Sequence, residues 1–328
     1  MTRLLEISGL KVHFRTDDGW VRAVDGVDIG VDGGETVSIV GESGCGKTVT
    51  AKTVLKLIDM PPGKIVAGSI TWQGRDLVPA TPAQMRAIRA KEIGFIFQEP
   101  MTSLNPVYTV GEQIAEAVRQ HEGLSRRTAI DRAAEMLSLV NIPNPTRRVH
   151  DYPHQFSGGM RQRVMIAMAL SCNPKLVIAD EPTTALDVTI QAQILDLLEE
   201  MKERLGMAVL LITHAMGVVA ENAQRVIVMY AGKVVEEAPV GALFATPLHP
   251  YTQGLIRSIP RLDLAATVHQ RLEAIPGTVP SLLHPPIGCR FAARCRFATE
   301  ECRAAEPPLR ELTPGHKVAC IHAESIAA

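Results

Sequence analysis

Short apolar runs alternate with amphipathic segments along this chain, and this alternation predicts strands interleaved with helices. Runs rich in β-branched and aliphatic residues predict strands at residues 36–40, 92–98, 176–180, 208–213 and 225–230. Nearer the N-terminus, LLEISGLKVHF and AVDGVDIGV alternate apolar with polar residues and predict two more strands, which end near Gly33. The pattern favours an α/β protein.

Apolar residues recurring every three or four positions predict the helices. One helix, at residues 47–58, ends before Met60-Pro61-Pro62-Gly63, and the segment 108–140 is expected to be mainly helical. Further helices are predicted at residues 158–170 and 189–205, the latter stopped by Gly206. A mostly helical insert therefore splits the α/β core.

The composition changes near residue 238, where proline-rich turns and four of the six cysteines begin. We therefore predict a first domain at residues 1–237, with a helical subdomain at about 99–170, and a C-terminal extension at residues 238–328. A length of 328 residues is compatible with two domains.

Overall composition indicates a folded protein and argues against nucleic acid as a partner. Hydrophobic residues make up 46% and charged residues 21%, and the net charge of −1 lacks the basic excess of nucleic-acid binders. The first residues lack the apolar stretch of a secretory signal. Because the longest apolar runs, at 164–172 and 207–212, fall far short of about 20 residues, we expect a cytoplasmic chain without a membrane span.

GESGCGKT matches the phosphate-binding pattern G-x-x-x-x-G-K-[ST] and lies between a predicted strand and a predicted helix. Glycines let backbone N–H groups approach phosphates, and the helix N-terminus favours their negative charge. Lys47 is expected to hold the β- and γ-phosphates of a nucleotide, and Thr48 to bind magnesium. Cys45 occupies a free position and is interpreted as a small, passive side chain. The expected nucleotide-binding residues are Gly41, Glu42, Ser43, Gly44, Cys45, Gly46, Lys47 and Thr48.

The apolar strand KLVIAD is followed by a second carboxylate, so that Asp180 and Glu181 lie at the end of a buried strand. We expect Asp180 to contact the magnesium shell and Glu181 to polarise the attacking water.

These motifs, with Ser157-Gly158-Gly159 inside HQFSGGMRQR, occur in the order found in the ATP-binding cassette family, which the chain resembles. The resemblance implies a P-loop NTPase fold with a mixed sheet, an antiparallel β subdomain and a helical subdomain. It also implies a dimer, since the Ser-Gly-Gly signature of one subunit contacts the nucleotide held by the other.

Further roles follow from the resemblance alone. Gln98, in FIFQEP, corresponds to the glutamine that senses magnesium and the γ-phosphate, and His214 to the switch histidine. Phe14 lies where an aromatic stacks on adenine, although it equally suits a strand core. Asp187 matches the loop that meets the partner subunit, and equally suits a helix N-cap.

The chain departs from the family pattern at three positions. Phe156 and Met160 replace the usual leucine and glutamine around the signature, and Ala215 follows the switch histidine where aspartate is usual. We still expect ATP hydrolysis. A kinase or GTPase with the same loop would leave the Ser-Gly-Gly signature unexplained.

Stretches at 98–114, 249–260 and 276–295 resemble the ATPases of dipeptide and oligopeptide importers. The resemblance implies a nonidentical ATPase partner, two integral membrane permease subunits, a solute-binding protein and a peripheral location on the cytoplasmic face of the inner membrane. The alternative is a soluble cassette ATPase of DNA repair or translation.

The C-terminal cysteines suggest a metal or a buried thiol cluster. Their spacing lacks the close pairs of structural zinc sites, and disulfides are disfavoured in a reducing cytoplasm. The resemblance implies a 4Fe–4S cluster, while zinc and free thiols remain alternatives. The residues concerned are Cys289, Cys295, Cys302 and Cys320.

Overall fold

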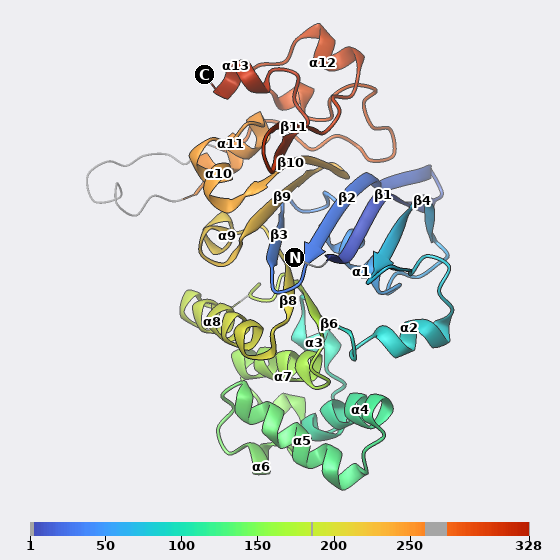
Figure 1. Cartoon of the computed structure of the whole chain (residues 1–328), viewed down its shortest axis with the longest axis vertical. Helices are drawn as coiled ribbons and strands as arrows, with labels where there is room; N and C mark the ends of the chain where they lie inside the picture. The colour runs from blue at the N-terminus through green and yellow to red at the C-terminus, as the bar shows by residue number, and fades with distance from the viewer. Residues whose placement is uncertain (1–2, 185, 260–273, 328) are drawn as a thin grey trace, which may run out of the picture. The chain divides into compact units, whose positions relative to one another are not determined.

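The computed structural model describes residues 3–184, 186–259 and 274–327 (Figure 1). Its contacts divide the chain into two compact units. Unit 1 comprises Met1–Leu4, Val31–Thr36 and Pro79–Ile212, and unit 2 comprises Leu5–Gly30, Val37–Val78 and Thr213–Ala328. Both units are therefore built from segments that are far apart in the sequence.

Unit 1 combines three parallel strands with a group of helices. Strand β7 pairs in parallel with β6 on one side and with β8 on the other, through the registers Ile93↔Leu176 and Leu176↔Ala208. All three are buried apolar runs, as parallel strands covered on both faces require. The strands are β6 (Ile93–Ile96), β7 (Leu176–Asp180) and β8 (Ala208–Thr213).

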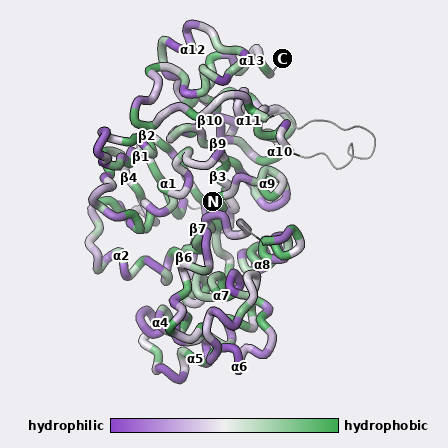
Figure 2. Tube along the Cα trace, turned by 180° about the vertical axis from the view of Figure 1, so that it is seen from behind, coloured by the Kyte–Doolittle hydropathy of each residue, from purple (hydrophilic) through white to green (hydrophobic). Residues whose placement is uncertain are grey.

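The longer helices of unit 1, α4, α5, α7 and α8, begin at side-chain caps and contain buried residues. Thr109 caps α4 and Ser125 caps α5, each through a side-chain oxygen that accepts a backbone N–H, and Gly123 ends α4 in the left-handed conformation. Hydrophilic and hydrophobic residues alternate along α4 and α5, as amphipathic packing requires (Figure 2). The helices are α2 (Pro82–Ile88), α3 (Pro100–Ser103), α4 (Val110–Glu122), α5 (Arg126–Leu139), α6 (Pro145–Arg148), η1 (Pro153–Gln155), α7 (Gly158–Leu170) and α8 (Val188–Leu205).

Unit 2 contains an antiparallel sheet in the order β2-β1-β4-β5 and a second set of strands in the order β11-β12-β10-β9-β3. In the second set β3 pairs with β9 in parallel, whereas β9, β10, β12 and β11 pair successively in antiparallel fashion. The strands are β1 (Arg3–Thr16), β2 (Gly19–Asp32), β3 (Thr36–Val40), β4 (Gly63–Trp72), β5 (Arg75–Asp76), β9 (Arg225–Tyr230), β10 (Lys233–Pro239), β11 (Arg310–Thr313) and β12 (His316–Val318).

Short helices complete unit 2. They are α1 (Lys47–Val54), α9 (Met216–Asn222), α10 (Val240–Ala245), α11 (Pro250–Arg257), η2 (Ala292–Arg294), α12 (Glu300–Ala304) and α13 (Ala323–Ala327). A buried cluster joins β9 and β10 to α10, α11 and the segment before η2, through Tyr230, Leu243, Tyr251 and Phe291. The C-terminal residues thus share a core with β9 and β10.

The predicted strands at 36–40, 176–180, 208–213 and 225–230 and the helix at 158–170 are confirmed to the residue. The helix predicted at 47–58 is wrong at its end: α1 stops at Val54, because Lys56 adopts a positive φ of 49° and the N–H of Leu57 turns back to the carbonyl of Lys52. Within the described part of the chain, no helix has the length and apolarity needed to span a membrane.

Candidate nucleotide site

The predicted site residues divide between the two units. Unit 2 contains Phe14, the loop at residues 41–48 and His214, whereas unit 1 contains Gln98, residues 157–159, Asp180, Glu181 and Asp187.

The glycine-rich loop runs from the end of β3 into the N-terminus of α1. Gly41 has φ +152°, and a Cβ built there would lie 2.1 Å from the carbonyl oxygen of Met229, so the chain has room only for glycine. At the N-terminus of a helix the backbone N–H groups point outward along the axis, and with the helix dipole they favour an anion. This local geometry fits a phosphate.

Lys47 begins α1 and is only 4% exposed. Its Nζ donates to the carbonyl oxygens of Gly41 at 2.7 Å and Glu42 at 3.1 Å, so the buried ammonium has polar partners inside the loop. Cys45 is also buried, and this burial raises the pKa of its thiol. A raised pKa disfavours the thiolate, which is the reactive form of the group.

Two other predicted residues of unit 2 have defined positions. Phe14, on β1, faces Gly63 of β4 in the antiparallel register, and a Cβ on that glycine would lie 3.1 Å from the phenyl ring. His214 directly follows β8 and is exposed. Next to it, the N–H of Ala215 donates to Thr213 Oγ1 at 3.1 Å, a local bond across this turn.

The carboxylate pair of unit 1 lies at the end of β7. Asp180 is 1% exposed. Glu181 adopts a φ of 48°, in the left-handed region that is uncommon for a residue with a side chain. Its backbone N–H donates to the carbonyl oxygen of Ile212 at 2.9 Å, which helps to hold this conformation.

The side chain of Glu181 is oriented by two donors. Gln98 Nε2 donates to Glu181 Oε2 at 3.0 Å, and Thr184 Oγ1 donates to the same oxygen at 2.9 Å. The structure thus brings together Gln98 and Glu181, which lie 83 residues apart in sequence. A carboxylate fixed in this way is suited to accept a proton from a water molecule.

The Ser-Gly-Gly turn starts α7. Ser157 Oγ accepts the N–H of Met160 at 3.4 Å, a long capping bond. A Cβ on Gly159 would lie 2.9 Å from Cγ2 of Ile190, whereas a Cβ on Gly158 would meet nothing within 4 Å. Among the residues that the structure describes, packing therefore accounts for Gly159 and not for Gly158. Asp187 caps α8, since its Oδ1 accepts the N–H of Ile190 at 2.9 Å.

Residues 24–184 match the family model for the ABC transporter, and residues 235–302 match that of the oligopeptide/dipeptide transporter, C-terminal region. The chain is 55% identical over 317 residues to the probable peptide ABC transporter ATP-binding protein y4tR of Sinorhizobium fredii, covering 97% of this chain and 94% of that protein. The chain belongs to the ABC transporter family. It is also 52% identical over 318 residues to the oligopeptide transport ATP-binding protein OppD of Bacillus subtilis, covering 97% of this chain and 88% of that protein.

A solved structure of this family supports the fold. The dimeric ATP-binding cassette MJ0796, in a post-hydrolysis state bound to ADP and Pi, matches with a TM-score of 0.65 and 28% identity, covering 72% of this chain and 99% of that chain. The predicted P-loop NTPase cassette fold is thereby confirmed, as is the resemblance to the ABC transporter family and its peptide-importer branch.

The four C-terminal cysteines of this ABC transporter protein line one mostly apolar cavity of about 20 Å³, together with His249. Burial raises the pKa of the Cys289 and Cys295 thiols. It raises the pKa of the Cys320 thiol to about 11. These thiols therefore favour the protonated form at neutral pH. Across residues 3–184, 186–259 and 274–327, no three His, Cys, Asp or Glu side chains are arranged to hold a metal ion. As arranged, the thiols therefore share a cavity without forming a metal site.

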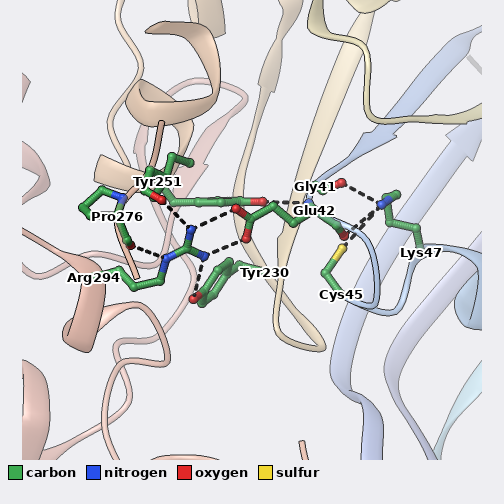
Figure 3. A network of polar contacts seen from close by, with 9 residues as sticks. Gly41, Glu42, Cys45, Lys47, Tyr230, Tyr251, Pro276 and Arg294 are labelled. Carbon is green, nitrogen blue, oxygen red and sulfur yellow. Dashed lines mark hydrogen bonds and ion pairs between the residues drawn. The ribbon is translucent and has the colours of Figure 1, made fainter. Parts of the chain in front are cut away.

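Sequence reasoning missed a polar network that reaches the phosphate loop (Figure 3). Arg294 forms two hydrogen bonds to the Glu42 carboxylate, and Tyr251 bonds the backbone of the same residue. Tyr251 and Arg294 lie in the stretches 249–260 and 276–295, which we used only to recognise the importer branch. No local pattern signals a pair separated by 252 positions.

Proposed function

We propose that this chain is the ATP-hydrolysing subunit that couples ATP binding and hydrolysis to the import of dipeptides, oligopeptides or related solutes through a membrane permease. The main support is the similarity over 97% of the chain to named peptide ABC transporter ATP-binding proteins. The match to the oligopeptide/dipeptide transporter C-terminal region adds to it, because this region lies outside the generic cassette.

The proposed roles follow the local chemistry. Lys47 binds the β- and γ-phosphates of ATP, Thr48 and Asp180 bind the magnesium ion or its shell, and Phe14 stacks on adenine. Glu181 takes a proton from water as the water oxygen forms a bond to the γ-phosphorus and the bond to ADP breaks. Gln98 orients Glu181 through the bond at 3.0 Å, and His214 contacts the γ-phosphate.

We further propose that two cassettes close on two ATP molecules. Ser157, Gly158 and Gly159 then contact the nucleotide of the other subunit, and Asp187 meets that subunit. The open space beside Gly158 supports this, because no contact in the described part of the chain requires a glycine there. Closure would move the helical subdomain, at about 99–170, against the permease.

The wider assembly is part of the proposal. It comprises a nonidentical ATPase partner, two integral membrane permease subunits and a solute-binding protein, with this chain peripheral on the cytoplasmic face of the inner membrane. The cassette domain is proposed to span residues 1–237 and the extension residues 238–328. The net charge of −1 argues against a nucleic-acid partner.

Substitution of Glu181 by glutamine tests the catalytic assignment. The amide keeps the size of the side chain but cannot take the proton, so the variant should bind ATP, accumulate as a closed dimer and lose nearly all turnover. Size-exclusion chromatography with ATP and a phosphate-release assay measure these outcomes. Normal turnover would contradict the role of Glu181.

Substitution of Gly158 by alanine tests the dimer. Alanine has space at this position, so the single subunit should fold and bind ATP normally. Dimer closure and hydrolysis should nevertheless be lost, because the added methyl group meets the partner's nucleotide. Undiminished hydrolysis would contradict a sandwiched site.

Co-purification separates transport from the alternative function. Recovery from membranes with integral permease subunits supports an importer. Recovery as a soluble complex with nucleic-acid-stimulated ATPase activity instead supports the DNA-repair or translation class.

A 4Fe–4S cluster on the four cysteines is a second proposal and contributes no step to turnover. The shared apolar cavity supports it, whereas the present arrangement of the thiols does not form a metal site. Anaerobic purification followed by iron and sulfide analysis tests it: about four irons per chain would support the cluster. Zinc, or a folded protein without metal, would contradict it.

A further inference from the structure

The phosphate loop is fixed from outside by a residue of the C-terminal region. Arg294 Nη1 lies 2.7 Å from Glu42 Oε2, and Arg294 Nη2 lies 2.9 Å from Glu42 Oε1, which makes a bidentate pair. The Arg294 side chain is only 4% exposed and that of Glu42 is 29% exposed. A bidentate, largely desolvated pair of this kind specifies geometry as well as charge.

The backbone of Glu42 is held as well. Its N–H donates to Tyr251 Oη at 2.8 Å, and its carbonyl oxygen accepts from Lys47 Nζ at 3.1 Å. The side chain, the N–H and the carbonyl of this residue therefore each have a partner (Figure 3). The partner of the carbonyl, Lys47, is the lysine that is predicted to bind phosphate. The position of Glu42 therefore affects that of the Lys47 ammonium group.

Arg294 and Tyr251, the two C-terminal partners of Glu42, are themselves held by packing and hydrogen bonds. Tyr230, Tyr251 and Phe291 form a buried aromatic cluster with ring centroids 4.7 to 5.5 Å apart, and the guanidinium of Arg294 lies 5.7 Å from the Tyr230 ring centroid. Four residues before Arg294, Arg290 bonds the Asp25 carboxylate and the carbonyl of Ala231. The segment that carries Arg294 is thus anchored on both sides of Phe291.

We propose that Arg294 and Tyr251 are positioning residues that hold Glu42, and with it the first turn of the phosphate loop, in the conformation that binds ATP. The C-terminal region then contributes directly to nucleotide affinity. This inference rests on the proposed function, in which the loop binds ATP.

Two effects should follow from loss of Arg294. The loop would have to be ordered by the nucleotide itself, which costs affinity. In addition, the Glu42 carboxylate would lose its countercharge and repel the incoming phosphates. Because hydrolysis uses other groups, the loss should appear in KM and leave kcat nearly unchanged.

The experiment measures binding of Mg-ATP to the full-length chain by displacement of a fluorescent ATP analogue, with thermal melting of each variant. Arg294→Gln should weaken ATP binding about tenfold, the cost of ordering about one residue. Tyr251→Phe removes one oxygen and should weaken binding about fivefold. Arg296→Gln is the matched control, because Arg296 is exposed and its guanidinium stacks on Phe297.

A double substitution distinguishes positioning from general destabilisation. Glu42→Gln in the Arg294→Gln background removes the repelling charge, so the double variant should bind ATP more tightly than Arg294→Gln alone. In ATPase assays on the assembled transporter, KM should rise for Arg294→Gln while kcat stays within about twofold of wild type.

Equal ATP affinity for Arg294→Gln and Arg296→Gln would overturn the inference. If Arg294→Gln does not fold, unchanged affinity in folded Tyr251→Phe would overturn it equally. Failure of the wild-type chain to bind Mg-ATP would refute the proposed function instead, so the two failures are distinguishable.

Discussion

His249 should make the stability of unit 2 depend on pH in a measurable way. The side chain is 1% exposed, and its Nδ1 accepts the N–H of Tyr251 at 3.1 Å, a bond that requires a neutral ring. Burial lowers the pKa of His249 from 6.5 to about 4, although the Glu236 carboxylate acts in the opposite direction. Between these two pKa values, His249 is protonated in the unfolded chain and neutral in the folded protein.

The sign and size follow from linkage. Above pH 6.5 both states are neutral and the stabilisation is complete, whereas between pH 6.5 and 4 only the unfolded state gains the proton and stability falls. The complete loss in the free energy of unfolding is about 3 kcal/mol, at about 1.4 kcal/mol per pKa unit. At a convenient pH of about 5, roughly 2 kcal/mol should already be lost.

Urea unfolding followed by tryptophan fluorescence is a suitable assay, because both tryptophans of the chain, Trp20 and Trp72, belong to unit 2. The comparison variant is His249→Asn, whose Oδ1 can still accept the N–H of Tyr251 but does not titrate. The free energy of unfolding of wild type relative to this variant should drop by about 2 kcal/mol between about pH 7.5 and pH 5. A parallel decline of both proteins would refute the assignment to His249.

Three further predictions concern the nucleotide site. Gly41→Ala places a methyl group against the carbonyl of Met229, so ATP titration should show binding weakened by at least about a hundredfold and melting should show a loss of about 2 kcal/mol; unchanged affinity would contradict the tight packing. Asp187→Ala removes the cap on Ile190 N–H and should cost about 1 kcal/mol by circular dichroism, whereas an unchanged stability would mean that the cap contributes nothing. Cys45 should resist iodoacetamide until the chain unfolds, because the thiol is buried with a raised pKa; rapid alkylation in the native state, detected by mass spectrometry, would contradict this.

Much of the fold was predictable because the buried parallel strands are continuous apolar runs. Strands β3, β7, β8 and β9 and helix α7 begin and end where the sequence places them. The early end of α1 was not predictable, since lysine is a good helix former and nothing local signals the positive φ of Lys56. The short elements after residue 239 depend on tertiary contacts rather than on periodicity.

In the candidate site too, some features follow from sequence motifs and others depend on tertiary contacts. The phosphate loop, Glu181 and the Ser-Gly-Gly turn belong to motifs whose residue types and spacing predict their chemical roles. The contact of Gln98 with Glu181 does not follow from spacing, because the motifs give the two residues separate roles. The bonds to Glu42 were missed because the phosphate-loop pattern gives its side chain no role, and no local pattern around Arg294 indicates a partner 252 residues away.

The Arg294–Glu42 pair has a consequence for exchanging parts between importers. Glu42 occupies a position that the phosphate-loop pattern leaves free, yet its partner lies 252 residues downstream. A chimera that joins this cassette to the C-terminal region of another importer would therefore lose the Arg294–Glu42 pair, unless the residues at both positions are taken from the same protein. Grafting boundaries in such proteins should be chosen by this long-range pairing rather than by the apparent domain border.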